Sequence, residues 1–394
     1  MQYIKMIKEN MKQKENKILK NLEKYKNKDF SFKNGRIIGS MCTQPLDIAK
    51  KTYMRFIETN LGDPELYPGT KEIELKYLKF LQKLLNAPKS SSGVIGTGGT
   101  EGNITAIWLA KNLTGKKEII IPKSAHFSFQ KIASIMDIKL IPANITNNLH
   151  LNITDVKNKI SKKTAAVVGI AGSTELGTID PIPDLSDICI DENIFLHVDA
   201  AFGGFVIPFL KDLGYNVYNF DFKLKGVSSI AIDAHKMGCS TIPLGSIIVR
   251  DKKWLDEISV ETPYISSKKQ AGILATRSGA SVVAAYAVSL YLGIDGYKKI
   301  VKKCMNTTYY AQEKIKGMGL KLVVNPTMNI LAIKLKRPSI VVDNLTKHGW
   351  KVNYMRRLSA IRIVIMPHIT NKVVDEFLPY LRKACKNAGE SISY

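Results

Sequence analysis

Residues 195–201 read FLHVDAA, and residues 228–236 read SSIAIDAHK. Each stretch is a short apolar run that ends in polar side chains, with Asp199 in the first and Lys236 in the second. Such a run is typical of a strand covered on both faces, as in a parallel sheet flanked by helices. Polar residues directly after these strands lie at the carboxyl edge of the sheet, where α/β proteins bind ligands. The two stretches therefore predict an α/β domain with a ligand site at one edge of its sheet.

Further apolar runs extend this pattern along the chain. They cover residues 118–122, 139–143, 165–172 and 245–250, and helical segments separate several of them. Strands that alternate with helices predict a large α/β domain with a mostly parallel sheet. We expect this domain to span residues 66–294.

Smaller segments are expected on either side of the large domain. Residues 1–65 read as a charged helix followed by a loop-rich stretch, and residues 295–394 as a small α+β domain. The small domain is predicted from a helix, from short strands at 320–324, 330–335 and 360–366, and from a final helix. At the start of the large domain, leucines spaced by three and four residues predict an amphipathic helix that Pro88 ends. These leucines are Leu75, Leu78, Leu81 and Leu85.

The charge of the chain restricts its partners. The formal net charge is +24 over 394 residues, but the lysines are spread along the chain rather than gathered in one block. A basic balance suggests a nucleic-acid partner, yet the sequence carries no zinc finger, aromatic RNA-binding motif or basic arm. We therefore expect a generally basic surface that attracts anionic ligands, and no nucleic acid. The polar, lysine-rich N-terminus lacks the apolar core of a signal peptide, which predicts a cytoplasmic protein.

Two other features exclude classes of protein. The most apolar stretch, residues 278–294, is shorter than a membrane span and dotted with Ser, Gly and Tyr, so a buried helix is expected and no membrane partner. The five cysteines are scattered and form no C-x-x-C pair, which argues against a disulfide framework and against a metal site. Of these cysteines only Cys239 is near Lys236 in the sequence, and we expect it to be a small packing residue.

A glycine-rich stretch, GTGGTEGN at 96–103, precedes a helical segment. Glycines let backbone N–H groups approach an anion closely, and a helix N-terminus adds a favourable dipole. Thr97 and Thr100 supply hydroxyl donors. The stretch is neither a Walker loop nor a spaced dinucleotide fingerprint. A phosphate site is one interpretation, and a glycine turn that caps a core helix is the other.

Together, the three stretches supply the contacts that a pyridoxal 5'-phosphate (PLP) enzyme needs. The glycine-rich stretch would bind the phosphate, Asp199 the ring nitrogen, and Lys236 the aldehyde as a Schiff base. Taken singly, a strand-end aspartate is as often a helix cap, and a strand-end lysine is usually a solvated loop residue. A lysine forms an imine when burial or nearby charge lowers its pKa. The combination predicts PLP as the cofactor.

The motifs TGGTEGN, HVDAAFGG and DAHK resemble those of the fold-type-I PLP enzymes, specifically the group II amino-acid decarboxylases. That group includes glutamate and aromatic-amino-acid decarboxylases, with sphingosine-phosphate lyase as a relative. NLGDPELYPGT at 60–70 and RIVIMPH at 362–368 are similar to the compact archaeal L-tyrosine/L-aspartate decarboxylases. The resemblance runs from about residue 36 to 370. It implies the PLP-dependent transferase fold of type I, with a seven-stranded sheet, and a homodimer.

The resemblance also implies a set of cofactor-binding residues. In this set His126 would stack on the pyridine ring, Ala201 would pack beneath it, and His235 would lie near the phosphate or the Schiff base. Thr174 would place a hydroxyl near the ring, although Ser173 stands beside it. The whole set is Gly99, Thr100, His126, Thr174, Asp199, Ala201, His235 and Lys236.

Reprotonation of the product requires an acid. In the larger decarboxylases a long mobile loop carries a tyrosine for this step, but the corresponding stretch here, residues 262–280, is short. Its only tyrosine, Tyr264, precedes the loop, and a phenol can serve as general acid. We expect Tyr264 to be the proton donor, with His126 or a water as alternatives.

Arg362 is the expected substrate-binding residue. It alternates with Ile361 and Ile363 in a strand-like stretch, so it would face the opposite side of that strand. The resemblance implies a small-domain arginine that binds the substrate carboxylate, which suits a planar guanidinium. The alternative is an ordinary surface charge.

The implied reaction is decarboxylation of an L-amino acid, a small-molecule substrate. The resemblance implies L-tyrosine to tyramine, a methanofuran precursor, or L-aspartate to β-alanine, a coenzyme A precursor, and on its own it favours tyrosine slightly. TRSG at 276–279 also resembles the lyase branch, so a carbon–carbon lyase of the sphingosine-phosphate type stays an alternative. Two further alternatives are a PLP enzyme acting on aminoacyl-tRNA and a nucleic-acid-binding protein that keeps an inactive PLP fold. An intact Asp199 and Lys236 argue against the last.

Overall fold

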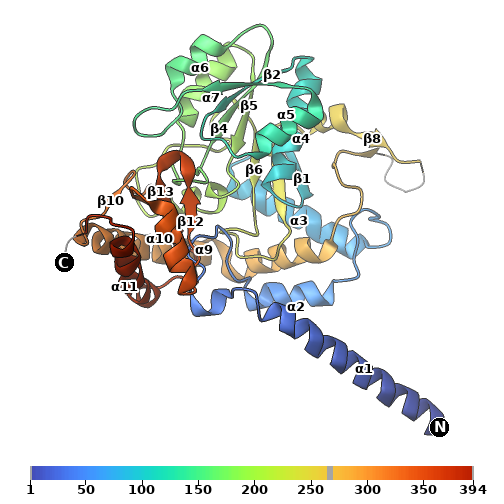
Figure 1. Ribbon diagram of the computed structural model, residues 1–394. Helices are drawn as coiled ribbons and strands as arrows, with labels where there is room; N and C mark the ends of the chain where they lie inside the picture. The colour runs from blue at the N-terminus through green and yellow to red at the C-terminus, as the bar shows by residue number, and fades with distance from the viewer. Residues whose placement is uncertain (1, 264–268, 393–394) are drawn as a thin grey trace.

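The computed structural model describes residues 2–263 and 269–392, and its centre is a seven-stranded sheet (Figure 1). The strand order is β1-β7-β6-β5-β4-β2-β3. The strands are β1 (Ser92–Gly96), β2 (Glu118–Pro122), β3 (Lys139–Ala143), β4 (Thr164–Ile170), β5 (Phe195–Asp199), β6 (Val227–Ile232) and β7 (Gly245–Val249). Neighbours from β3 to β6 pair in parallel, whereas β7 pairs antiparallel with both β6 and β1. The predicted mostly parallel sheet of an α/β fold is confirmed.

Helices cover both faces of this sheet. They are α2 (Asp47–Arg55), α3 (Pro68–Leu84), α4 (Gly99–Thr114), α5 (Ser128–Met136), α6 (Ile153–Lys159), α7 (Ile182–Asp191), α8 (Ile207–Asp212) and α9 (Gly279–Gly317). Alternate residues of one strand enter different cores: Ile119 packs in a cluster with α4 and α5, and Ile120 in a cluster with α3, α7 and α9. Burial on both faces explains why these strands read as continuous apolar runs.

The predicted buried helix at 278–294 is the first half of α9. By length and composition α9 is apolar enough to cross a membrane, but half of its most apolar stretch is buried inside the protein. It packs against α2 and α3 as a core helix. Gly293, with φ 55°, interrupts it, and this conformation favours glycine. The expected boundary at 294/295 falls beside this interruption, within one helix, and the division into domains stays a prediction.

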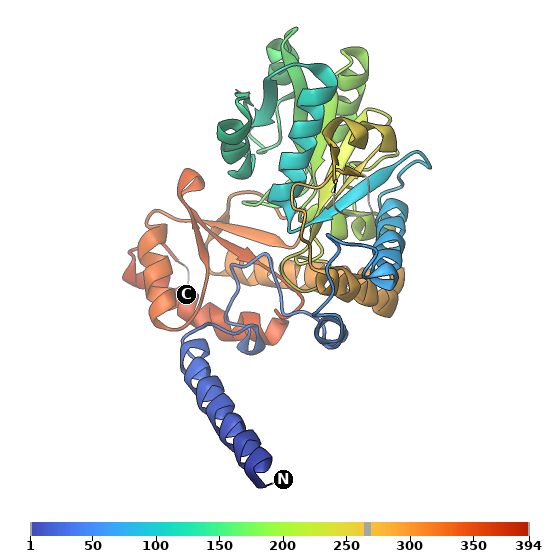
Figure 2. The same ribbon diagram turned by 90° about the vertical axis from the view of Figure 1, so that its right-hand side faces the viewer.

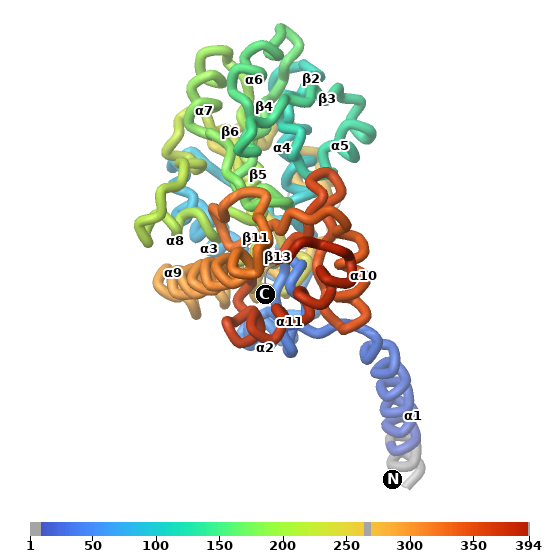
Figure 3. Tube along the Cα trace, turned by 60° about the vertical axis from the view of Figure 1, so that its left-hand side comes forward, coloured from blue at the N-terminus to red at the C-terminus, as the bar shows by residue number. Residues whose placement is uncertain are grey.

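A second, four-stranded sheet follows α9, with the order β10-β11-β13-β12 and antiparallel pairing. It consists of β10 (Lys321–Leu322), β11 (Ile330–Lys334), β12 (Asn353–Met355) and β13 (Ala360–Val364), with α10 (Pro338–Lys347) and α11 (Asn371–Asn387). These elements enclose a core of their own, which includes Trp350 and Phe377. Figure 3 shows this unit beside the large sheet, and Ile38 from the N-terminal segment packs into its core.

The N-terminal helix α1 (Gln2–Lys26) projects away from the rest of the protein in Figures 1 and 2. Its described side chains, from Glu9 onward, are exposed. The remaining short elements are the two-stranded ribbon of β8 (Val260–Glu261) and β9 (Lys269–Gln270) and four 3-10 turns. These turns are Phe32–Asn34, Gly203–Phe205, Lys252–Ile258 and Arg356–Leu358.

Several sequence expectations are corrected. The stretch predicted to be loop-rich contains α2, and the strands β1, β8, β9 and β12 were not predicted. The helix α3 ends at Leu84, before Pro88, and Leu75 is 48% exposed rather than part of the apolar face. The predicted face holds for Leu81 and Leu85, which are fully buried.

Candidate active site

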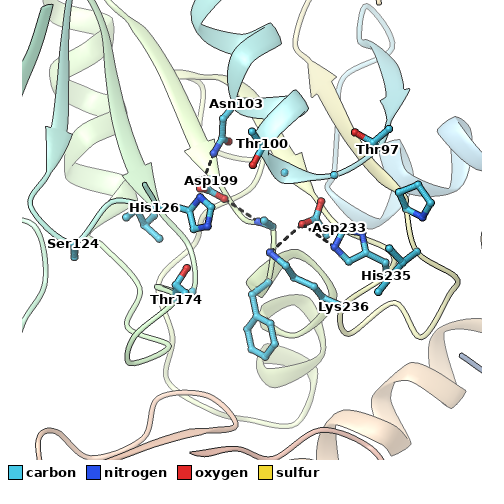
Figure 4. Close-up of a pocket in the computed structure, with 18 residues that line it drawn as sticks. Thr97, Thr100, Asn103, Ser124, His126, Thr174, Asp199, Asp233, His235 and Lys236 are labelled. Atoms are coloured by element: carbon cyan, nitrogen blue, oxygen red, sulfur yellow. Dashed lines mark hydrogen bonds and ion pairs between the residues drawn. The ribbon is translucent and has the colours of Figure 1, made fainter. Parts of the chain in front are cut away.

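A cavity of about 450 Å³ lies where the carboxyl ends of β4, β5 and β6 meet the N-terminus of α4 (Figure 4). Parallel strands place their carboxyl ends at one edge of the sheet, so the residues that follow them converge there. The cavity is lined by Thr97, Gly98, Gly99, Thr100, Asn103, Ser124, His126, Ile170, Gly172, Thr174, Asp199, Ala201, Phe202, Asp233, His235, Lys236, Ile242 and Pro243. Every residue of the predicted cofactor-binding set lines it.

The glycine-rich stretch forms one end of this cavity. It links β1 to α4, whose first residues are Gly99 and Thr100. Glu101 accepts hydrogen bonds from the Thr97 N–H (2.7 Å) and hydroxyl (2.8 Å), which fixes the turn. A Cβ atom at Gly99 would lie 2.9 Å from the Cβ of Ala201, so a side chain does not fit there. The first N–H groups of a helix have no intrahelical partner, so this end of the cavity suits an anion.

Asp199 lies in the middle of the cavity wall, at the end of β5, and is 8% exposed. Its Oδ2 accepts a hydrogen bond from Asn103 Nδ2 (3.0 Å), and its Oδ1 accepts one from the Ala201 N–H (3.1 Å). These two donors fix the orientation of the carboxylate, whose remaining lone pairs are available to bind an N–H group in the cavity.

Lys236 lies opposite the glycine-rich stretch and forms an ion pair with Asp233, with Nζ 3.0 Å from Oδ2. Burial lowers the pKa of Lys236, but the nearby Asp233 and Asp199 carboxylates outweigh burial and raise the pKa above its ordinary value. The sequence argument named a lowered pKa as the condition for imine formation, and it did not consider Asp233, which in the structure raises the pKa of Lys236. The same carboxylate is placed to accept the proton that the ammonium must lose before its nitrogen can attack a carbonyl.

Two histidines border the cavity. Nδ1 of His126 accepts a hydrogen bond from the Ser128 N–H (3.2 Å), and burial lowers the pKa of His126, so its ring is neutral at pH 7. His235 is held by the backbone of Leu244, with its Nδ1 2.7 Å from the carbonyl oxygen. Its Nε2 lies 3.7 Å from Asp233 Oδ2.

Arg362 approaches the cavity from the small sheet without lining it. It is 8% exposed and donates hydrogen bonds to the carbonyls of Gly39 (2.8 Å) and Thr174. Its side chain lies on the other side of β13 from Ile361 and Ile363, which excludes the surface-charge alternative. Burial lowers the pKa of Arg362 to about 10, so it stays charged at pH 7. Its Nε has no hydrogen-bond partner among the described residues.

The remaining candidates are placed as follows. Thr174 lines the cavity, whereas the adjacent Ser173 bonds to the Thr178 hydroxyl (2.8 Å) instead. Tyr264 lies outside the described residues. Cys239 is buried packing, as expected, but Cys42 also lies near the chemistry, because Lys236 and Asp233 influence its pKa, which burial raises.

Sequence reasoning assigned no role to Asn103 or Asp233. Both stand inside quoted motifs, four residues after Gly99 and three before Lys236. Their roles follow from contacts with Asp199 and Lys236. The position of Asp233, three residues before a candidate Schiff-base lysine and directly after a strand, is the signal that could have identified it.

The donor set of this cavity fits PLP. It offers an anion site at a helix N-terminus, a carboxylate for a protonated ring nitrogen and an amine for an aldehyde. Among the described residues no group of three or more His, Cys, Asp or Glu side chains is placed to bind a metal ion.

Comparisons with known proteins agree with this fit. The sequence profile of the pyridoxal-dependent decarboxylase conserved domain matches residues 48–336. The "Probable L-tyrosine/L-aspartate decarboxylase" of Methanothermobacter thermautotrophicus is 45% identical over 88% of this chain and 97% of its own length. An L-aspartate/L-glutamate decarboxylase of Pyrococcus horikoshii is also 45% identical, over 93% of this chain and 96% of its own.

A solved structure shows the same fold at lower identity. A sphingosine-1-phosphate lyase of Burkholderia pseudomallei superposes with a TM-score of 0.88 and 24% identity, covering 95% of this chain and 91% of that one. The sequence matches extend over most of the chain and include the cavity. The chain belongs to the pyridoxal-dependent decarboxylase family, whose cofactor is pyridoxal 5'-phosphate.

Proposed function

We propose that the protein removes the α-carboxyl group of L-aspartate to give β-alanine, with PLP bound to Lys236. The observation that supports this most directly is the cavity itself, in which the α4 N-terminus, Asp199 and Lys236 face one another. When bound, PLP supplies a ring that accepts the electron pair left at Cα as carbon dioxide departs. The protein's own residues bind the cofactor, position the substrate and move the protons.

The cofactor would be held at three points. The backbone N–H groups of Gly99 and Thr100 would bind the phosphate, with His235 beside them. Asp199 would pair with the ring nitrogen and keep it protonated, which is the electrostatic contribution of the protein to catalysis. Ala201 and His126 would pack against the ring.

Lys236 and Asp233 would control the proton at the reacting end. In the cofactor-free protein the Lys236 ammonium is paired with Asp233, 3.0 Å away. Asp233 is 1% exposed, so its carboxylate cannot exchange this proton freely with bulk water. It would take the proton from Lys236 as the amine attacks the cofactor carbonyl. In the same way it would return the proton when Lys236 is displaced by substrate.

Arg362 would bind a substrate carboxylate. Its Nε is unpartnered among the described residues, and a buried guanidinium has a strong preference for a carboxylate in a bidentate arrangement. The carbonyls of Gly39 and Thr174 hold the rest of its fork in place. Tyr264 is proposed as the acid that protonates Cα.

L-aspartate is favoured for two reasons. Both sequence relatives described above carry L-aspartate in their names. A net charge of +24 also attracts a substrate such as L-aspartate, whose two carboxylates and one ammonium group give it a net negative charge. L-tyrosine is a second candidate, because Ile242, an apolar residue that lines the cavity, has 60% of its surface exposed and would contact an aromatic ring.

The active protein is proposed to be a cytoplasmic homodimer. Helix α9 exposes Leu290, Tyr291 and Ile294 at 66%, 71% and 44%, and a second copy of the chain would cover them. Light scattering of the holoenzyme should give twice the 43.9 kDa of one chain. A fully active species of 43.9 kDa would remove this part of the proposal.

The activity is tested by supplying the purified holoenzyme with L-aspartate, L-tyrosine or L-glutamate and measuring carbon dioxide and amine together. We expect equal amounts of carbon dioxide and β-alanine from L-aspartate, and a slower release of tyramine from L-tyrosine. A phosphorylated long-chain amino alcohol serves as the substrate for carbon–carbon cleavage. Aldehyde from that substrate, without carbon dioxide from any amino acid, would replace the decarboxylase by a lyase.

A further inference from the structure

A chain of hydrogen bonds between buried side chains ends at Asp199. Ser229 Oγ lies 2.8 Å from His197 Nδ1, and His197 Nε2 lies 2.9 Å from Asn103 Oδ1. Asn103 Nδ2 donates to Asp199 Oδ2 at 3.0 Å. Ser229 and His197 are fully buried and Asn103 is 2% exposed, so solvent supplies none of these partners. These hydrogen bonds join β6, β5 and α4.

The direction of each bond follows from its partners. Asn103 must present its amide hydrogens to Asp199, because the carboxylate only accepts, and Nδ2 also donates to Ser128 Oγ (3.2 Å). Its carbonyl oxygen therefore faces His197, which must carry a hydrogen on Nε2. Nδ1 of His197 then accepts from the Ser229 hydroxyl. Burial lowers the pKa of His197 to about 4, which keeps this single neutral tautomer at working pH.

This arrangement uses both amide hydrogens of Asn103 and fixes the carboxylate that accepts one of them. The second oxygen of Asp199 accepts from the Ala201 N–H (3.1 Å). With one donor on each oxygen, rotation of the carboxylate group would break both bonds. The remaining lone pairs have one orientation, toward the cavity.

We infer that Asn103 and His197 are positioning residues for the ring nitrogen of the cofactor, acting through Asp199. His197 fixes the orientation of the Asn103 amide, and that amide fixes the orientation of the Asp199 carboxylate. The inference rests on the proposed role of Asp199. A packing role alone would not require these side chains to be polar, since apolar residues of the same shape fill a core without the desolvation cost.

The test compares PLP with its analogue in which a C–H group replaces the ring nitrogen. Both ligands share the phosphate and the aldehyde, so the ratio of their dissociation constants reports on the ring nitrogen alone. The full-length protein is stripped of PLP and titrated with each ligand, followed by absorbance. His197→Gln keeps an N–H donor at the reach of Nε2, whereas His197→Met has a similar shape without a donor.

We expect wild type and His197→Gln to prefer PLP over the analogue, and His197→Met to lose at least about tenfold of that preference. Tenfold is near the low end of what a hydrogen bond to a charged group contributes. Binding of the analogue should be similar in all three proteins. Two results would contradict the inference: His197→Met binds both ligands more weakly by the same factor, or its preference for PLP is unchanged. In either case the hydrogen bonds from His197 to Asp199 do not position the ring nitrogen, and His197 has a packing role only.

Ser229→Ala provides a second test in case His197→Met does not fold. It removes only the terminal hydroxyl, and we expect the preference for PLP to fall while analogue binding holds. An unchanged preference in Ser229→Ala would count against a positioning role of these hydrogen bonds. Asp199→Asn distinguishes the proposed role of Asp199 from the positioning role of Asn103 and His197. If Asp199→Asn abolishes a preference for PLP that His197→Met and Ser229→Ala retain, only the positioning role is wrong. If wild type itself has no preference, the role of Asp199 fails with it.

Discussion

The neutral state of His197 predicts a specific pH dependence of stability. His197 is fully buried, and its pKa falls from 6.5 to about 4 on folding, first because of burial and with Asp199 opposing the shift. Between these two values the unfolded chain binds a proton at this histidine that the folded protein does not. The stabilisation is therefore fully present above pH 6.5 and is lost as the pH falls toward 4.

The size of the effect follows from the two pKa values. A pKa of 6.5 in the unfolded chain against about 4 in the folded protein predicts a loss of about 2–3 kcal/mol in the free energy of unfolding between pH 7 and pH 4.5. Asp180 opposes this in the wild type. It is buried, its pKa is raised to about 6, and it therefore stabilises the folded protein at low pH and loses that contribution as the pH rises through 6. The pH profile of the wild type alone would hide the contribution of His197.

The comparison that isolates His197 is between wild type and His197→Gln, since Asp180 and all other groups titrate alike in both. Urea unfolding of the PLP-free proteins would be measured at intervals from pH 4.5 to pH 7. We expect the stability difference between them to change by about 2–3 kcal/mol, with the wild type losing more on acidification. A difference that stays constant over this range would show that His197 is protonated in the folded protein, and the tautomer argument would fail.

Three further predictions concern the cavity. Asp199→Asn should lower kcat at least about a hundredfold, or roughly 2.7 kcal/mol, while PLP still attaches to Lys236; near-native turnover would contradict its role. Arg362→Ala should cost about 2–5 kcal/mol in kcat/KM for L-aspartate. Arg362→Lys should also weaken substrate binding, and both variants should keep full PLP occupancy. Native affinity of Arg362→Ala in a substrate titration would show that another group binds the carboxylate. Gly99→Ala should weaken PLP binding at least about tenfold, by analogy with other overpacked sites, because its Cβ would lie 2.9 Å from the Cβ of Ala201. The matched control is Gly69→Ala, where a Cβ meets nothing within 4 Å, and this variant should bind PLP normally.

The large sheet could be predicted from sequence because most of its strands are buried on both faces. β4 and β6, for example, are buried at every position and consist mostly of apolar residues, with Ser228 and Ser229 as the exceptions in β6. The missed strands lack this signal. β1 contains two glycines and a serine and pairs only with β7, and β12 has three residues, two of them exposed. α2 has only Ala49 fully buried and is stabilised by its packing on α9, a contact that no local pattern reveals.

The site was predictable to the extent that it depends on strand ends. Asp199 and Lys236 follow apolar strands, so topology alone places both at the same sheet edge. Asn103 and Asp233 act through specific side-chain contacts, and the Asn103–Asp199 bond joins residues 96 positions apart. The spacing of Asn103 and Asp199 along the chain does not indicate that they are in contact. The raised pKa of Lys236 depends on the side chain of Asp233, which stands only three residues before it, and the sequence argument did not use that spacing.

The most direct test of the central claim is borohydride reduction of the holoenzyme, followed by peptide mapping and paired with a decarboxylation assay on the same preparation. The reduced cofactor should be found on the peptide that contains Lys236, in a protein that releases carbon dioxide and β-alanine from L-aspartate before reduction and neither afterwards. The Lys236→Ala variant should give no adduct and no product. An adduct on a different lysine, or product formation by Lys236→Ala, would contradict the assignment of this cavity as the active site.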